Sequence, residues 1–350
     1  MDGMMKIILR VLIWVLALLG AGVGVLTVSL LASAIRPARN IGIDQVQVSD
    51  AGGGSIGVLI YYPTQSKPQL TWMGLLFADV APRAPLATGQ HALVVISHGT
   101  AGAATSHIDT AIALAERGFV VAAPIHNRDN FQDQSGIGAA SWIADRAREI
   151  RRVNDFMLTQ WRFRAQIDAN RIGLFGFSAG ATTALINVGA QPDFALVTSD
   201  CRQHSQFVCR LLRPDVTLQS GAEQGYDSRI KAVVLAAPGL GMGFTRTSLA
   251  RVNIPVAIWA GDRDVNAPLA GNAAAIAANW PTLVSVHVAQ GAGHFSFLAP
   301  CGPLGLLLPP MLCSDPANFD RRAFHQTFNS EVAAFFEARL GRDPPLDERP

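Results

Sequence analysis

From residue 46 onward, short runs rich in Val, Ile and Leu alternate with stretches of helical composition, and this alternation restricts the fold most strongly. Such continuously apolar runs are typical of strands buried on both faces of a mostly parallel sheet, with helices covering each face. The alternation predicts one α/β domain over residues 41–341. Eight strands are expected, at residues 46–48, 56–62, 92–97, 119–124, 171–175, 231–236, 255–260 and 283–289. Helices are expected at residues 107–117, 139–163, 179–188, 269–279 and 321–340.

Some segments depart from this alternation. The first two strands flank Gly52-Gly53-Gly54 and are expected to pair antiparallel. Residues 191–228 and 296–320 are too long for ordinary connections, and insertions of that length are often lids or binding loops. We expect residues 191–228 to be a lid-like insertion. The polar, Pro-rich tail at 342–350 is expected to be disordered.

The N-terminus contains an uncharged apolar run from Val11 to Ile35, between Arg10 and Arg36. As a helix this run is long enough to cross a bilayer core of about 30 Å. It ends in Ala32-Ser33-Ala34, the small-x-small pattern of a signal-peptidase site. Residues 1–36 are therefore either a cleaved signal peptide or an uncleaved membrane anchor. Both alternatives predict an exported protein, periplasmic or extracellular in the first case and held at the membrane in the second.

A nucleophile is indicated by the sequence Gly176-Phe177-Ser178-Ala179-Gly180, which follows an expected strand and begins an expected helix. This is the G-x-S-x-G elbow, in which small residues two before and two after the serine allow a sharp turn. The turn lifts the Ser178 hydroxyl above the sheet and directs the helix N-terminus at the substrate. The alternative, a structural turn in a Gly-rich chain, does not account for the strand before it and the helix after it.

An oxyanion hole is expected between the elbow and the loop Ser97-His98-Gly99-Thr100-Ala101-Gly102, which follows the strand at 92–97. The backbone N–H groups of Thr100 and Ala179 would be its two donors. We expect His98 itself to be structural.

The general base should follow the acid along the chain, and of the eight histidines only His287, His294 and His325 lie late enough. His287 falls inside a strand and His325 inside the last helix, whereas His294 lies in a Gly-rich loop at the C-terminal end of a strand. The acid is Asp264 or Asp262, both in Gly261-Asp262-Arg263-Asp264. We favour Asp264 because it lies further into the loop, while Asp262 would suit a turn.

Other patterns indicate little chemistry. The formal net charge is +2, with no clustered basic face, which argues against nucleic acid as a partner. No Gly-rich phosphate loop and no His/Cys cluster of zinc spacing occur, so we expect no cofactor and no metal. The arginines of residues 145–164 are interpreted as the solvated face of an amphipathic helix. Residues 126–129 follow a strand near the active-site edge, where a substrate contact is possible.

These motifs, together with Ile96-Ser97-His98-Gly99 and Gly293-His294, resemble the dienelactone hydrolase-like branch of the α/β hydrolases, which is itself similar to platelet-activating-factor acetylhydrolases. The resemblance covers roughly residues 56–340 and implies an α/β-hydrolase fold, with the second aspartate of the GxxD turn, Asp264, as the triad acid. Ser178 stands where true dienelactone hydrolases carry cysteine, a departure that argues against dienelactone as the substrate. The resemblance implies esterase or lipase chemistry with an unspecified acyl group, and we expect a small-molecule or lipid-like ester as the substrate.

Three functions compete on this sequence. The leading hypothesis is an exported serine esterase that works through Ser178, His294 and Asp264 and an acyl-enzyme. A peptidase or amidase could use the same residues. A silent, membrane-tethered binding protein is the third, although all three residues of a triad are present.

The four cysteines allow three connectivities. We expect Cys201–Cys209 and Cys301–Cys313, each closing a short loop within one insertion, since an exported protein meets an oxidising compartment. Four reduced, buried cysteines are the alternative for a cytosolic domain.

Overall fold

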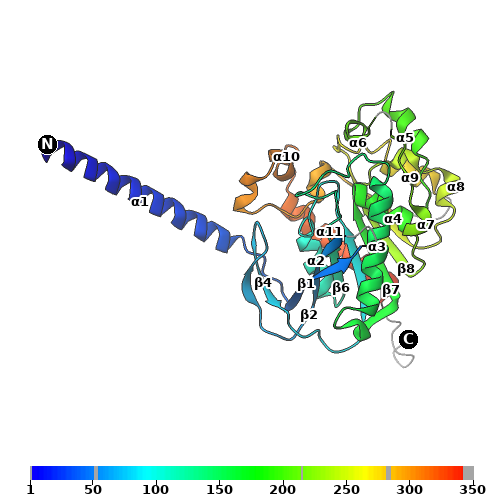
Figure 1. Ribbon diagram of the computed structural model, residues 1–350, viewed down its shortest axis with the longest axis horizontal. Coiled ribbons are helices and arrows are strands. Elements are labelled where there is room, and N and C mark those ends of the chain that lie inside the picture. The colour runs from blue at the N-terminus through cyan, green and yellow to red at the C-terminus, as the bar shows by residue number, and fades with distance from the viewer. Residues whose placement is uncertain (1, 51–53, 214–215, 281–284, 342–350) are drawn as a thin grey trace.

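The computed structural model of the chain describes residues 2–50, 54–213, 216–280 and 285–341, and within them a ten-stranded sheet has the order β10-β9-β8-β7-β5-β6-β2-β1-β4-β3 (Figure 1). The strands are β1 (Ile41–Ser49), β2 (Ser55–Pro63), β3 (Gln69–Trp72), β4 (Phe77–Pro82), β5 (His91–Ser97), β6 (Val120–Pro124), β7 (Ile167–Phe177), β8 (Ile230–Ala236), β9 (Val256–Gly261) and β10 (Ser285–Ala289). Strands β5 to β10 run parallel to one another, whereas β2 is antiparallel to both β1 and β6.

The helices follow the strands in the order expected for an α/β chain. The α-helices are α1 (Asp2–Ala32), α2 (Ile108–Glu116), α3 (Trp142–Thr159), α4 (Ala179–Asn187), α5 (Phe194–Cys201), α6 (Phe207–Leu211), α7 (Ala222–Gly225), α8 (Arg246–Leu249), α9 (Ala273–Asn279), α10 (Pro310–Cys313) and α11 (Arg321–Leu340). The short 3₁₀ segments are η1 (Arg164–Gln166), η2 (Gly241–Gly243), η3 (His294–Phe297) and η4 (Pro303–Leu307).

The predicted α/β-hydrolase architecture is confirmed, but the strand count of eight is too low. All eight predicted strands are present, although residues 283 and 284 of the last lie outside the described residues. The two missed strands are β3 and β4, which pair antiparallel through Trp72 and Phe77 at the end of the sheet. The side chains of β3 are largely exposed, so no apolar run marks it; hydrogen bonding to β4 defines it instead.

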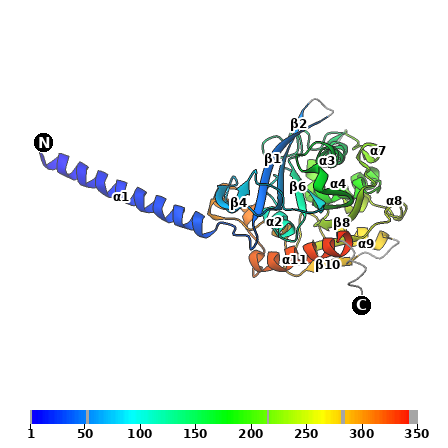
Figure 2. The ribbon, with the colours of Figure 1, turned by 90° about the horizontal axis from the view of Figure 1, so that it is seen from below.

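The sheet is covered on both faces, as predicted. On one face α3, α4 and α9 pack against alternate strand residues, with Trp161, Leu185 and Ile276 in that core. On the other face α2 and α11 pack against the intervening residues, with Phe328 and Phe336 in the second core. Figure 2 shows α2 and α11 on the side of the sheet opposite to α3 and α4. This two-sided burial explains why the central strands are apolar without alternation.

The N-terminal helix α1 projects away from the domain (Figure 1). Its segment Met4–Ala32 is long and apolar enough to cross a membrane, and none of it is buried against the protein; a signal sequence would have the same properties. After α1, Ile35 joins the sheet margin: its N–H donates to the carbonyl of Phe77 at 2.9 Å, and its carbonyl accepts from the N–H of Asp79 at 2.9 Å.

Each of the two insertions folds into short helices. Within the described residues, 191–228 forms α5, α6 and α7, and 296–320 forms the last two residues of η3 together with η4 and α10. Disulfides join Cys201 to Cys209 and Cys301 to Cys313, which are the two predicted pairings. The predicted disordered tail at 342–350 lies outside the described residues, as do Gly52 and Gly53 of the predicted turn.

Candidate active site

Ser178 occupies the sharp turn between β7 and α4, with φ +53° and ψ −117°. A residue with a side chain rarely adopts this conformation, so the surroundings must enforce it. Close approach explains the two glycines: a Cβ at Gly176 would collide with the carbonyl of Gly180, and a Cβ at Gly180 would collide with the carbonyl of Ser97. The Ser178 N–H donates to the carbonyl of Ala236 at 3.0 Å, which ties the turn to β8. The hydroxyl is thereby presented at the C-terminal edge of the sheet.

The structure brings Ser178, His294 and Asp264 together from three separate segments. His294 Nε2 lies 3.0 Å from Ser178 Oγ, and His294 Nδ1 lies 2.7 Å from Asp264 Oδ2. The other carboxylate oxygen of Asp264 accepts from the backbone N–H groups of Asn266 and Ala267 at 2.9 and 2.7 Å. Because the carboxylate only accepts, Nδ1 carries the ring proton and Nε2 is left to accept the serine hydroxyl.

Asp262, the other candidate acid, lies elsewhere. It is exposed, and its Oδ1 accepts from the N–H of Gly291 at 2.6 Å. It therefore fastens the loop after β10 to the loop after β9, as a turn residue would. Among the described residues, the carboxylate that meets His294 is that of Asp264.

Thr100 and Ala179 line one small cavity together with Ser178 and His294. Within the described chain, the backbone N–H of neither residue donates to a protein group. Ala179 is the first residue of α4, where a helix leaves its N–H groups unpaired. The next N–H groups of the 97–102 loop are occupied: that of Ala101 by Asp129 Oδ1 at 2.7 Å and that of Gly102 by the carbonyl of Gly99 at 3.1 Å.

A buried ion pair lies under this loop. Arg146 Nη1 donates to Asp129 Oδ2 at 2.5 Å, and Trp142 Nε1 donates to the same oxygen at 2.6 Å. Arg146 also donates to Thr183 Oγ1 at 3.1 Å and to the carbonyl of His98. Asp129 therefore links the N–H of Ala101, next to Thr100, to Trp142 in the first turn of α3. Arg146 holds the same loop at the carbonyl of His98.

The sequence interpretation of the arginines in residues 145–164 as one solvated face is wrong for Arg146, which is buried. Arg151 and Arg152 are exposed, as expected. The missed signal is the spacing of α3 itself. The buried residues of α3 recur every three to four positions: Trp142, Arg146, Glu149 and Val153. An Arg and a Glu therefore lie on the same helix face as two apolar residues, and that face is turned toward the sheet.

The two histidines nearest the loop are structural. His98 is buried; its Nε2 accepts from the N–H of His126 at 3.1 Å, and its Nδ1 lies 2.6 Å from the carbonyl of Gly99. Burial, together with the charge of Arg146, lowers the pKa of His98 to about 4, so the ring is neutral. His126 and Asp129 are buried too. The substrate contact considered for residues 126–129 does not extend to these two side chains.

Glu149 completes this buried polar cluster. Its Oε2 lies 2.7 Å from His126 Nδ1, and its carboxyl accepts from the N–H of Asn127 at 3.2 Å. Ser97 Oγ contacts the other ring nitrogen of His126 at 2.9 Å. Burial raises the pKa of Glu149 to about 8, so a proton is held within this cluster at neutral pH.

The insertion at 191–228 lies over Ser178. Phe207, Val208 and Leu211 of α6 line the same cavity as Ser178, whose volume is about 20 Å³, roughly enough for one water molecule. Phe194 and Val197 of α5 pack in a separate apolar cluster with Trp142 and Ala179. Gln206 fastens α6 to the domain, since its Oε1 accepts from Asn272 Nδ2 at 2.9 Å. The cavity as it stands is too small for an ester of ordinary size.

The region after His294 is also fixed by polar contacts. Ser296 Oγ accepts from the N–H of Gly293 at 3.0 Å and donates to Asp315 at 2.7 Å, two residues after Cys313. His325 of α11 contacts the carbonyl of Ser296 at 2.9 Å through Nε2 and Asp109 at 2.6 Å through Nδ1. Both ring nitrogens of His325 are thus engaged, which agrees with its exclusion as the base.

Comparison with known proteins agrees with this architecture. Residues 80–198 match the model of a family described as the dienelactone hydrolase family. Among solved structures, a ferulic acid esterase from Streptomyces cinnamoneus is similar with a TM-score of 0.65 and 19% identity, covering 91% of this chain and 97% of that one. No match was found among the curated proteins. At this identity the structural similarity supports the fold alone.

Proposed function

We propose that this chain, an α/β hydrolase of the dienelactone hydrolase-like branch, is a serine esterase whose nucleophile is Ser178. The observation that carries the proposal is the continuous hydrogen-bonded chain from Ser178 Oγ through His294 to Asp264, placed beside two unused backbone N–H groups. A general base within 3.0 Å of the hydroxyl, and an acid that fixes its tautomer, are what acyl transfer to serine requires.

In the proposed reaction, Ser178 Oγ attacks the ester carbonyl while its proton passes to His294 Nε2. The carbonyl oxygen becomes an oxyanion, which the N–H groups of Thr100 and Ala179 stabilise. His294 then gives the proton to the departing alkoxide, so that an alcohol leaves and an acyl-enzyme remains. Water attacks the acyl-enzyme, gives one proton to His294, and releases the carboxylic acid as Ser178 recovers its hydrogen. Asp264 stays ionised throughout and stabilises the charged imidazole.

The substrate class follows from the walls of the cavity. The side chains that α6 contributes are apolar, which favours an ester with an apolar acyl or alcohol group over a charged one. We therefore propose a small-molecule or lipid-like ester, hydrolysed without a cofactor. The two disulfides and the apolar α1 favour a site of action outside the cytosol, either released or anchored by α1.

The test combines covalent labelling with a substrate panel. A fluorophosphonate probe should label the wild-type chain and leave Ser178→Ala unlabelled, because the probe needs an activated serine. The wild type should hydrolyse p-nitrophenyl esters, and Ser178→Ala should fall to the residual catalysis of about 10³–10⁴ over water that the oxyanion hole can supply. Faster turnover of peptide anilides than of esters would indicate a peptidase or amidase. Absence of labelling in the wild type would indicate a silent binding protein.

A further inference from the structure

Six large apolar side chains are exposed where α1 leaves the domain: Leu70, Trp72, Leu75, Leu306, Leu307 and Met311, here called the junction patch. Leu306 is 78% exposed, Leu307 66% and Met311 58%, and these three belong to the insertion at 296–320. Trp72 is 48% exposed and lies, with Leu70 and Leu75, on the β3–β4 hairpin. A soluble surface rarely gathers this many large apolar side chains without a partner.

The two segments of the junction patch adjoin each other and the end of α1. A Cβ placed on Gly302, just before η4, would lie 3.7 Å from Ser33 Oγ, 3.8 Å from the carbonyl of Leu75 and 3.9 Å from Leu76 Cβ. The disulfide between Cys301 and Cys313 holds Met311 close to the same point. Figure 1 shows α10 and the β3–β4 hairpin at the end of the domain from which α1 projects.

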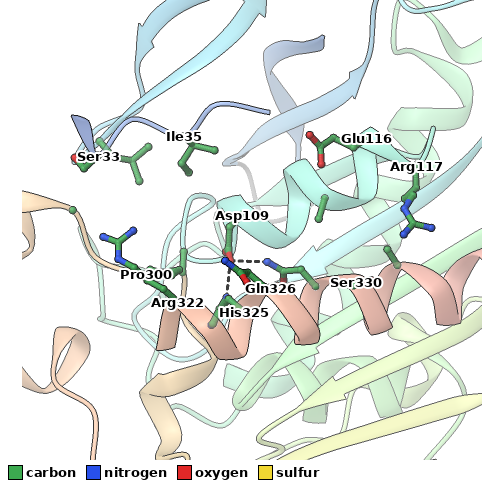
Figure 3. Close-up of a pocket in the computed structure, with 16 residues that line it drawn as sticks. Ser33, Ile35, Asp109, Glu116, Arg117, Pro300, Arg322, His325, Gln326 and Ser330 are labelled. Carbon is green, nitrogen blue, oxygen red and sulfur yellow. Dashed lines mark hydrogen bonds and ion pairs between the residues drawn. The ribbon is translucent and has the colours of Figure 1, made fainter. Parts of the chain in front are cut away.

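A cavity of about 540 Å³ opens at this junction, walled by Ser33 after α1, by Pro300, and by Asp109 and His325 on α2 and α11 (Figure 3). Its polar walls differ from the junction patch, and its rim carries Arg322, which is exposed. Arg36 is exposed on the same side, although Asp79 lies 3.7 Å from it and offsets part of its charge.

We infer that the junction patch inserts into the interfacial layer of the lipid bilayer that α1 enters. The occupant is a lipid surface because none of the long apolar segment of α1 is buried against the protein, and the end of α1 adjoins both segments of the junction patch. A bilayer crossed by α1 meets the domain at that point. Leucine, methionine and tryptophan side chains are those that settle at the boundary between headgroups and acyl chains. Docking through two separate segments would fix the tilt of the domain on the membrane.

The test uses the full chain in nanodiscs holding one copy, with a single cysteine introduced for an environment-sensitive fluorophore at Leu306 or at Leu70. Both labels should shift to shorter emission wavelengths and lose at least about twofold in intensity when the acyl chains are brominated, because insertion by 5–10 Å brings them within reach of the bromines. The matched control is Val286, 41% exposed against 43% for Leu70, on β10 at the opposite edge of the sheet. It should show neither effect.

Equal responses at Leu306, Leu70 and Val286 would overturn the inference. So would a wavelength shift that occurs only with two copies per disc and without quenching, since a second chain would then cover the junction patch. Loss of residues 1–34 from the mature protein would overturn it as well. The double variant Leu306→Asp/Leu307→Asp should abolish quenching of the Leu70 label while its circular dichroism spectrum stays unchanged. None of these measurements depends on the proposed esterase activity.

Discussion

Ser178 holds its strained backbone because Gly176 and Gly180 let the turn close on itself and against the loop at Ser97. Its side chain contacts His294, 116 residues further along the chain, and His294 in turn contacts Asp264, which lies 86 residues after Ser178. The partners of Ser178 are buried, whereas the serine is partly accessible. At the scale of single residues the proposed chemistry therefore depends on carboxylates that substrate does not reach, Asp264 behind the imidazole and Asp129 behind the loop of Thr100.

For the acid, Asp264→Asn should lower kcat on a p-nitrophenyl ester by about 10³–10⁴-fold, because an amide can donate to Nδ1 and hold His294 in the wrong tautomer. Asp262→Asn is the control in the same loop. It keeps the oxygen that accepts from Gly291, so its kcat should change less than about threefold. If Asp262→Asn is the crippling change, the assignment of Asp264 is wrong.

Asp129 is expected to position the oxyanion loop without touching substrate. In Asp129→Asn, the buried charge of Arg146 loses its partner and the Ala101 N–H loses a charged acceptor, so the Thr100 N–H should move from its place. We expect kcat to fall roughly 10–100-fold, since displacements near 1 Å cost this much, with little change in KM. Asp133→Asn, at an exposed carboxylate four residues later, should leave both constants unchanged. A rise in KM at constant kcat would instead place Asp129 in substrate binding.

At the scale of elements, α3 and α6 make different contributions to the site. The buried side of α3 carries Arg146 and Glu149 beneath the loop at residues 97–102, while α6 places apolar side chains around the Ser178 cavity. Helix α6 is held by the disulfide between Cys209 and Cys201 and by the hydrogen bond between Gln206 and Asn272. Because the cavity below it is so small, the size of the α6 side chains should determine which acyl groups fit.

Leu211→Ala should therefore favour longer acyl chains. Removing this side chain widens the cavity, and each accommodated methylene contributes roughly 1–3 kcal/mol, so the ratio of kcat/KM for octanoate over acetate esters should rise at least about fivefold. Leu196→Ala alters an exposed leucine of the same insertion that does not line the cavity, and should leave the ratio unchanged. Equal effects in both variants would mean that the insertion influences specificity only through the stability of the fold.

Across the whole molecule, the buried charged groups on the α3 side lie under the active-site edge of the sheet, and the apolar junction patch lies at the end from which α1 projects. The buried cluster of Glu149, His126 and Arg146 couples the stability of the fold to pH. Burial raises the pKa of Glu149 to about 8, against an ordinary value of 4.5, so the folded state holds a proton that the unfolded chain releases between these values. The stabilisation is complete below about pH 4.5 and is lost as pH rises through 8.

Glu149→Gln should remove this pH dependence, because the amide resembles the protonated carboxyl. Between pH 5 and pH 8.5 the thermal unfolding midpoint of the wild type should fall by roughly 2–6 °C more than that of the variant, measured in the same detergent. The other groups titrate in both proteins and cancel in the comparison. Parallel curves for the two proteins would show that Glu149 does not change its protonation on unfolding.

The sequence alone indicated the features that depend on neighbouring residues: the eight predicted strands, their covering helices, the elbow at Ser178 and the apolar N-terminal run. Burial on both faces holds for the central strands but not for β10, none of whose residues is buried. Each of these features follows from a local periodicity or from a local turn, because the residues that produce the feature lie within a few positions of it. The choice of His294 also followed from its place after a strand. The paired cysteines were proposed from loop length, and the same pairs are joined in the structure.

The features that depend on residues far apart in the chain became visible only in the three-dimensional structure. Loop position favoured Asp264, but its contact with His294 arises because two loops 30 residues apart meet at one sheet edge. The helical pattern of α3 located its apolar face, yet the burial of Arg146 depends on Asp129 and on the loop of His98. In each case the stabilising partner is distant in sequence, so no local pattern can indicate it.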